Sequence, residues 1–137
     1  MTIALTADDD RKELIAEFCL AYSGILSAHN LLGTGTTGAI IREATGLDVE
    51  QLAPGGLGFQ QLIAKAAYNE VDMVFYFRNS GNPEMRYMMD DTSLDFEVLV
   101  RVCDANMIPL ATNMATAELL VKGLERGDLD WRTLLET

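Results

Sequence analysis

The chain has 137 residues, 49% of them hydrophobic, which fits one globular domain over residues 1–137 and excludes a disordered chain. Its formal charge of −11 argues against nucleic acids and anionic membranes as partners. No apolar run approaches the ~20 residues of a membrane span, and residues 1–20 do not resemble a signal peptide. We therefore expect a cytoplasmic protein in which Cys19 and Cys103, which lack metal-ligand spacing, are reduced core residues.

The first predicted elements are a buried strand over residues 2–7 and a helix over residues 11–22. Three aspartates at positions 8–10 join them. Asp10 and Glu13 match a capping box, which gives a structural role to at least one of the three. Ligands in open α/β sheets bind beyond the carboxyl ends of strands, so Asp8 or Asp9 is a candidate functional carboxylate. A Mg²⁺ site is not favoured, because consecutive side chains diverge.

The second predicted strand, residues 29–33, leads into the loop Thr34-Gly35-Thr36-Thr37-Gly38 and then into a helix that ends near Gly46. Glycines and short hydroxyl residues at a strand-to-helix junction leave backbone N–H groups free. Together with the positive end of the helix dipole, such groups bind phosphate. The alternative is that one of these threonines only caps the helix. The loop has neither the lysine of a P-loop nor the spacing of a dinucleotide fingerprint.

The rest of the chain continues the alternation of strands and helices. We predict a short extended piece in 47–54, a glycine-rich loop at 54–58, a helix over 59–69 and a central strand over 71–77. A long loop over 78–93 and a helix over 95–106 follow. The last elements are a strand over 109–112 and a helix ending near 124, capped by Thr112 or Asn113. The glycine-rich loop is either a second wall of an anion pocket or a connector. The pattern predicts an α/β fold, a three-layer sandwich with a mainly parallel sheet of about five strands flanked by helices.

Several motifs in this order resemble the methylglyoxal synthase family, which includes the allosteric domain of carbamoyl-phosphate synthetase. The matching residues are Ile3-Ala4-Leu5, Lys12, Thr34-Gly35-Thr36-Thr37-Gly38, Ala44-Thr45-Gly46-Leu47, Gln60-Gln61, Val71-Asp72, Arg101, Ile108-Pro109-Leu110-Ala111-Thr112-Asn113 and Ala115-Thr116-Ala117. The match spans nearly the whole chain.

The resemblance implies an enzyme that eliminates phosphate from dihydroxyacetone phosphate and that assembles as a homohexamer. We expect no cofactor and no metal. In the family a carboxylate removes a proton, a histidine stabilises the enediol oxygen, and a cradle holds the phosphate. By resemblance, phosphate binding here falls on Lys12, Thr34, Gly35, Thr36, Thr37, Ala53, Pro54, Arg101 and Arg132.

The family's catalytic positions differ in this sequence. The catalytic aspartate of a Gly-Gly-Asp-Gln-Gln motif is replaced by Phe59, and the catalytic histidine aligns with Thr92. A further family aspartate aligns with Asn79, and the cradle has Ala53 in place of a serine. The single histidine, His29, starts the second strand, where we interpret it as structural.

Some acidic residues remain as candidates for catalysis. Asp9 and Asp95 align with family active-site aspartates, and Asp90 and Asp91 lie in an insertion after Asn79 that is either a lid or a longer solvated loop. Phe59 itself either stacks on a planar ligand or fills the volume of the lost active site.

Three hypotheses follow. The favoured one is a protein that binds a small phosphorylated metabolite or inorganic phosphate, with little or no lyase activity. The second is an active lyase that uses Asp9, Asp95 or an acid of the insertion as its base. The third is a structural or partner-binding subunit with a vestigial pocket, for which changes at Lys12 and Thr36 leave assembly and partner binding intact.

Overall fold

The computed structural model describes residues 1–79 and 91–136, with the backbone alone at 91–93 and 135–136. Its centre is a five-stranded sheet in the order β3-β2-β1-β4-β5, in which every neighbouring pair is parallel. The strands are β1 (Thr2–Ala7), β2 (Asn30–Gly33), β3 (Val49–Gln51), β4 (Met73–Phe77) and β5 (Leu110–Ala111). The helices are η1 (Asp9–Arg11), α1 (Lys12–Ala21), α2 (Ser23–Leu26), α3 (Gly35–Thr45), α4 (Gly55–Ala67), α5 (Asp91–Asn106), α6 (Met114–Arg126) and η3 (Asp130–Glu136).

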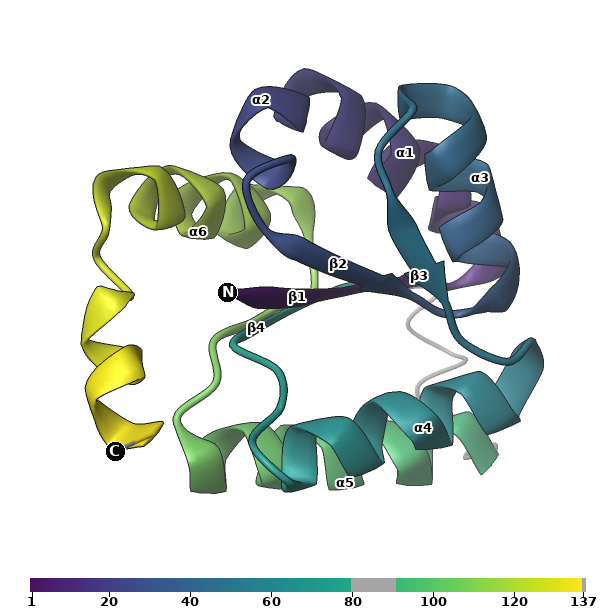
Figure 1. The fold of residues 1–137 in the computed structure, drawn as a ribbon. Coiled ribbons are helices and arrows are strands. Elements are labelled where there is room, and N and C mark those ends of the chain that lie inside the picture. The colour runs from purple at the N-terminus through teal and green to yellow at the C-terminus, as the bar shows by residue number, and fades with distance from the viewer. Residues whose placement is uncertain (80–90, 137) are drawn as a thin grey trace.

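Helices cover both faces of the sheet. In Figure 1, α1, α2, α3 and α6 lie on one side, and α4 and α5 lie on the other. Successive strand residues point to opposite faces, so Ile3 and Leu5 belong to the first core and Ala4 to the second. The predicted α/β fold of three layers is confirmed.

Local signals place most elements correctly. β4 is buried along its whole length, as expected for a strand covered on both faces, but the central strand of the sheet is β1, so the prediction that β4 is central is wrong. Gly46 ends α3 in the left-handed conformation, with φ of 75°. The side chain of Asn113 caps α6 by accepting a hydrogen bond from the Thr116 N–H at 3.1 Å.

The structure corrects three helix starts and the proposed capping box. α5 begins at Asp91 rather than Asp95, so the predicted loop over 78–93 ends before residue 91. α3 begins at Gly35 rather than Thr37, and α4 at Gly55 rather than Phe59, so the second glycine-rich segment is mostly helix. One glycine of α4 serves close packing: a Cβ at Gly58 would overlap the carbonyl oxygen of Ala53. The capping box predicted at Asp10 is wrong, because Asp10 lies inside η1 and no side chain caps α1.

The two cysteines are free and buried, as predicted. Cys19 belongs to the core beneath α1 and Cys103 to the core beneath α5, on opposite faces of the sheet. Burial raises the pKa of both thiols, to about 12 for Cys19 and about 11 for Cys103. Among the described residues, no helix is long and apolar enough to cross a membrane.

Candidate functional site

The Thr34–Gly38 segment lies where β1 and β2 end. The Thr34 hydroxyl is 2.7 Å from the Thr6 hydroxyl of β1, in a buried contact that joins the two strand ends. Thr34 occupies the position before α3, yet its side chain does not cap that helix. The alternative of a simple capping threonine is therefore not what the structure shows for Thr34.

The first turn of α3 has donors without acceptors. The Gly35 N–H donates to the Leu52 carbonyl at 3.1 Å, and the Gly38 N–H donates to the Thr34 carbonyl at 2.9 Å. Between them, the N–H groups of Thr36 and Thr37 have no backbone or side-chain acceptor among the described residues. Free N–H groups at the positive end of a helix dipole suit a phosphate oxygen.

The start of α4 lies against the start of α3. A Cβ at Gly35 would lie 2.5 Å from the Cα of Pro54, so only glycine permits this approach. The Ala53 N–H is already taken by the side-chain oxygen of Gln61 at 2.9 Å, and Pro54 has no N–H to give. The structure thus brings Ala53 and Pro54 to the loop, but as a wall and not as free donors.

Lys12 supplies positive charge at the end of β1. Its Nζ is 2.8 Å from Oδ1 of Asp9, and its side chain is 20% exposed while that of Asp9 is almost fully exposed. The hydrogen bond from Lys12, and then its charge, hold the pKa of Asp9 below its ordinary value of 3.8. Asp9 is therefore ionised at neutral pH and competes with any anionic ligand for the lysine.

An aromatic cluster lies between β4, α4 and α5. The ring of Phe59 meets that of Tyr76 edge-on at 5.3 Å between centroids, and Tyr76 meets Phe96 in the same way at 5.6 Å. Phe59 is partly buried and packs against the core on this face. Of the two interpretations of Phe59, the contacts support the one in which its ring fills volume inside the protein.

Asp8 has a defined position that the sequence did not reveal. Its Oδ1 accepts a hydrogen bond from the Tyr76 hydroxyl at 2.7 Å, and its Oδ2 accepts one from the Asn79 N–H at 2.8 Å. These contacts tie the acidic segment after β1 to the end of β4. Pairing across 68 and 71 residues leaves no local pattern in the sequence.

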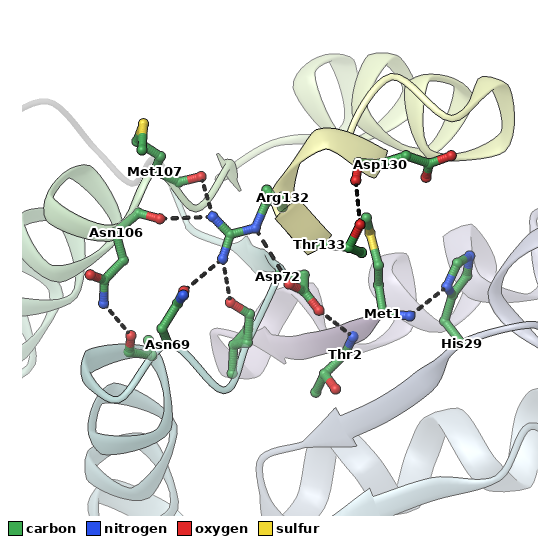
Figure 2. A network of polar contacts seen from close by, with 12 residues as sticks. Met1, Thr2, His29, Asn69, Asp72, Asn106, Met107, Asp130, Arg132 and Thr133 are labelled. Atoms are coloured by element: carbon green, nitrogen blue, oxygen red, sulfur yellow. Dashed lines mark hydrogen bonds and ion pairs between the residues drawn. The ribbon is translucent and has the colours of Figure 1, made fainter. Parts of the chain in front are cut away.

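Arg132 lies at the opposite end of the sheet from the Thr34–Gly38 segment. Figure 2 shows its guanidinium among residues from the turns that precede β4 and β5. It is 2% exposed, and its partners are the Asp72 carboxylate, the Asn69 side chain and the carbonyls of Val71, Asn106 and Met107. The structure therefore does not bring Arg132 to the phosphate loop of its own chain.

Arg101 is not brought there either. It lies well along α5, its side chain is 78% exposed, and it pairs with Glu97 at 2.9 Å. His29 is also distant, just before the amino end of β2, with its Nδ1 3.3 Å from the N-terminal amine. Burial, and then the charge of that amine, lower the pKa of His29.

A groove of about 910 Å³ opens at the amino ends of β1, β2 and β3, away from the Thr34–Gly38 segment. Its charged lining mixes Arg42 and Lys65 with Asp48, Glu50 and Glu70. Such a surface does not select anions, so we place the candidate site at the carboxyl edge instead. In the described part of the chain, no three His, Cys, Asp or Glu side chains gather as a metal site would require.

Comparison with known proteins decides the family. No protein-family model matches the chain. The chain is 49% identical to the methylglyoxal synthase of Caldicellulosiruptor saccharolyticus, over 98% of this chain and 92% of that protein, and 47% identical to that of Thermoanaerobacter sp. strain X514, over 98% of each. The crystal structure of methylglyoxal synthase from Elizabethkingia anophelis NUHP1 superposes with a TM-score of 0.72 at 32% identity, covering 88% of this chain and 76% of that one. The chain belongs to the methylglyoxal synthase family.

The positions that the family resemblance marks as catalytic can now be placed. Phe59 lies in the aromatic cluster and Asp9 beside Lys12. Asp95 lies near the start of α5, partly exposed, with no hydrogen bond or ion pair to another described residue. Thr92 and Asp91 have a described backbone in α5 but no described side chain, and Asp90 lies outside the described residues, as does most of the insertion.

Proposed function

We propose that this member of the methylglyoxal synthase family binds a small phosphorylated metabolite, or inorganic phosphate, at the carboxyl edge of its sheet. Lys12 and the free N–H groups of Thr36 and Thr37 are the groups that would hold the phosphate. Local donors are needed because the chain as a whole carries a charge of −11 and repels anions at long range.

We further propose that the protein eliminates phosphate from dihydroxyacetone phosphate slowly or not at all. The observation that carries this proposal is Phe59, whose ring has no atom that can accept a proton and packs against Tyr76. Loss of a positioned base costs roughly 10²–10⁴-fold in rate, and loss of an oxyanion-stabilising group costs roughly 10²–10³-fold. Thr92, at the family's histidine position, adds the second loss.

The test measures methylglyoxal formation from dihydroxyacetone phosphate together with the melting temperature in millimolar phosphate. We expect negligible turnover and a melting temperature that phosphate raises in the wild type but not in Lys12→Ala. Lys122→Ala on α6, which removes the same charge from an exposed position, serves as control and should respond as the wild type does. Failure of phosphate and triose phosphates to bind at millimolar concentration would overturn the proposal.

An active lyase is the second candidate, and the 49% identity to a methylglyoxal synthase favours it. In that case Asp9, Asp95 or an acid of the insertion acts as the base. Turnover that disappears in Lys12→Ala and in one of the variants Asp9→Asn, Asp95→Asn or the double change at Asp90 and Asp91 would establish it. Turnover unchanged in all of these carboxylate variants would exclude these bases.

We also propose that the chain forms a homo-oligomer, and a hexamer by family resemblance. Large apolar side chains are exposed on several helices, among them Leu119 at 72%, Leu57 at 61% and Leu20 at 55%. Light scattering of the purified protein should give a mass several times the 15.0 kDa of one chain. A monomeric mass would contradict this.

A further inference from the structure

Arg78 is a cation on the carboxyl edge of the sheet. It directly follows β4, which lies between β1 and β5, and its N–H donates to the Thr112 carbonyl at 3.2 Å. Ligands of open parallel sheets bind beyond these strand ends. Arg78 is thus on the same edge as Lys12 and the Thr34–Gly38 segment.

Its guanidinium is held by the aromatic cluster. The Cζ atom lies 3.8 Å from the centroid of the Phe96 ring and 6.0 Å from that of Tyr76. A cation over an aromatic face at such a distance is electrostatically attracted to the ring. Phe59 packs against Tyr76, so the residue that replaces the family's catalytic aspartate belongs to the support of this arginine.

The guanidinium has no oxygen partner within the described residues. Its Nε is buried without a hydrogen-bond acceptor. Each of the other described arginines, at positions 11, 42, 101, 126 and 132, has a carboxylate or carbonyl oxygen as partner. The nearby Asp8 carboxylate accepts from the Tyr76 hydroxyl and the Asn79 N–H instead. Within the described part of a chain with 21 acidic residues, a guanidinium without an oxygen partner suits an external anion.

We propose that Arg78 binds a carboxylate of the ligand, so that the ligand class is a small phosphorylated carboxylic acid. This rests on the proposed function, in which Lys12 and the start of α3 hold the phosphate. One guanidinium supplies one positive charge in a fork that matches a carboxylate, whereas a second phosphate would bring up to two negative charges. The ends of β2 and β4, with β1 between them, are roughly 10 Å apart from strand spacing.

The test compares two ligands that differ in one group. 3-Phosphoglycerate carries a carboxylate where glycerol 3-phosphate carries a hydroxymethyl group. Isothermal titration should show that the wild type binds 3-phosphoglycerate about 10- to 100-fold more tightly, the range expected for a charge-assisted contact. Arg78→Gln should bring the ratio of the affinities for 3-phosphoglycerate and glycerol 3-phosphate near one. Its affinity for inorganic phosphate should stay within about twofold of the wild-type value. Arg78→Lys, which keeps the charge without the fork, should be intermediate.

Arg126→Gln is the matched control, since Arg126 is 63% exposed and pairs with Asp128 at the end of α6. It should retain the wild-type ratio. Equal wild-type affinity for the two ligands, or a ratio that Arg78→Gln leaves unchanged, would overturn the role of Arg78 while phosphate binding still supports the proposed function. If inorganic phosphate does not bind either, both proposals fail together.

Discussion

The guanidinium of Arg132 joins turns that are distant in sequence at the amino edge of the sheet. Its acceptors come from residues 69–72 before β4 and residues 106–107 before β5. Asp72 also accepts the Thr2 N–H at 2.8 Å, so the same carboxylate fixes the start of β1. These contacts give Arg132 a structural role in this chain.

We therefore expect Arg132→Met to destabilise the protein by about 3–5 kcal/mol, because the buried Asp72 and several carbonyls lose their partner. The measurement is urea unfolding followed by circular dichroism. Arg126→Met, at an exposed ion pair, should cost less than about 1 kcal/mol. Similar losses in the two variants would show that the Arg132 network contributes little.

Asp9 and Lys12 allow a second test at the scale of residues. Asp9→Asn should tighten phosphate binding roughly two- to fivefold, since it releases the lysine from an exposed ion pair. Asp10→Asn removes the same charge next to Arg11 and serves as control, with a smaller effect expected. Equal effects in isothermal titration would show that Lys12 does not contact the phosphate.

The ion pair of Asp9 and Lys12 makes the stability of the protein depend on pH. The folded-state pKa of Asp9 lies below 3.8, so the contribution of the pair to stability is present above that pH and is lost as pH falls through the lowered pKa. The difference in melting temperature between wild type and Asp9→Asn should therefore vanish in strong acid. A difference that persists there would mean that Asp9 acts through something other than its charge.

Among the elements, the junction of α3 and α4 depends on contact between backbones. Gly35→Ala should push α3 away from Pro54, cost about 1–3 kcal/mol of stability and weaken phosphate binding. Gly24→Ala in α2 is the control, since a Cβ there meets nothing within 4 Å, and it should be neutral or stabilise by up to about 1 kcal/mol. Thermal unfolding measures both, and a harmless Gly35→Ala would contradict the close approach.

The sequence predicts elements where local chemistry decides them. The apolar run at β4, the glycine after α3 and the cap at Asn113 all have local signals, and each was located correctly. The start of α4 was missed because glycines are usual in loops, while here Gly58 allows the helix to pack against the Ala53 carbonyl. At that position close packing, and not the low helix propensity of glycine, decides where the helix begins.

The site was predictable only in part. The loop at 34–38 and Lys12 were found from the strand-to-helix pattern and the family resemblance, and they lie at ends of neighbouring strands. The contacts of Asp8 with Tyr76 and of Arg78 with Phe96 were not, because they join residues far apart along the chain or depend on how a side chain folds back. Local sequence patterns likewise could not predict that Arg132 is buried at the amino edge of the sheet.

For the whole molecule, the sheet separates two cores, and each core holds one cysteine. If the protein unfolds in one cooperative step, both thiols become reactive over the same range of urea concentration. Before unfolding, burial and the raised pKa of each thiol keep labelling by iodoacetamide slow. Mass spectrometry of the labelled peptides reads the two cores separately, and earlier labelling of Cys103 would show that the α4–α5 layer opens first.

The carboxyl edge divides into two halves carried by different strands. Backbone N–H groups and Lys12 lie at the ends of β1 and β2, whereas the rings and Arg78 belong to β4, α4 and α5. A substitution in the second half leaves the backbone donors of the first in place. Substitutions that change the reacting or discriminating group therefore leave the proposed phosphate-binding half intact, and a lineage can change its specificity without first losing that half.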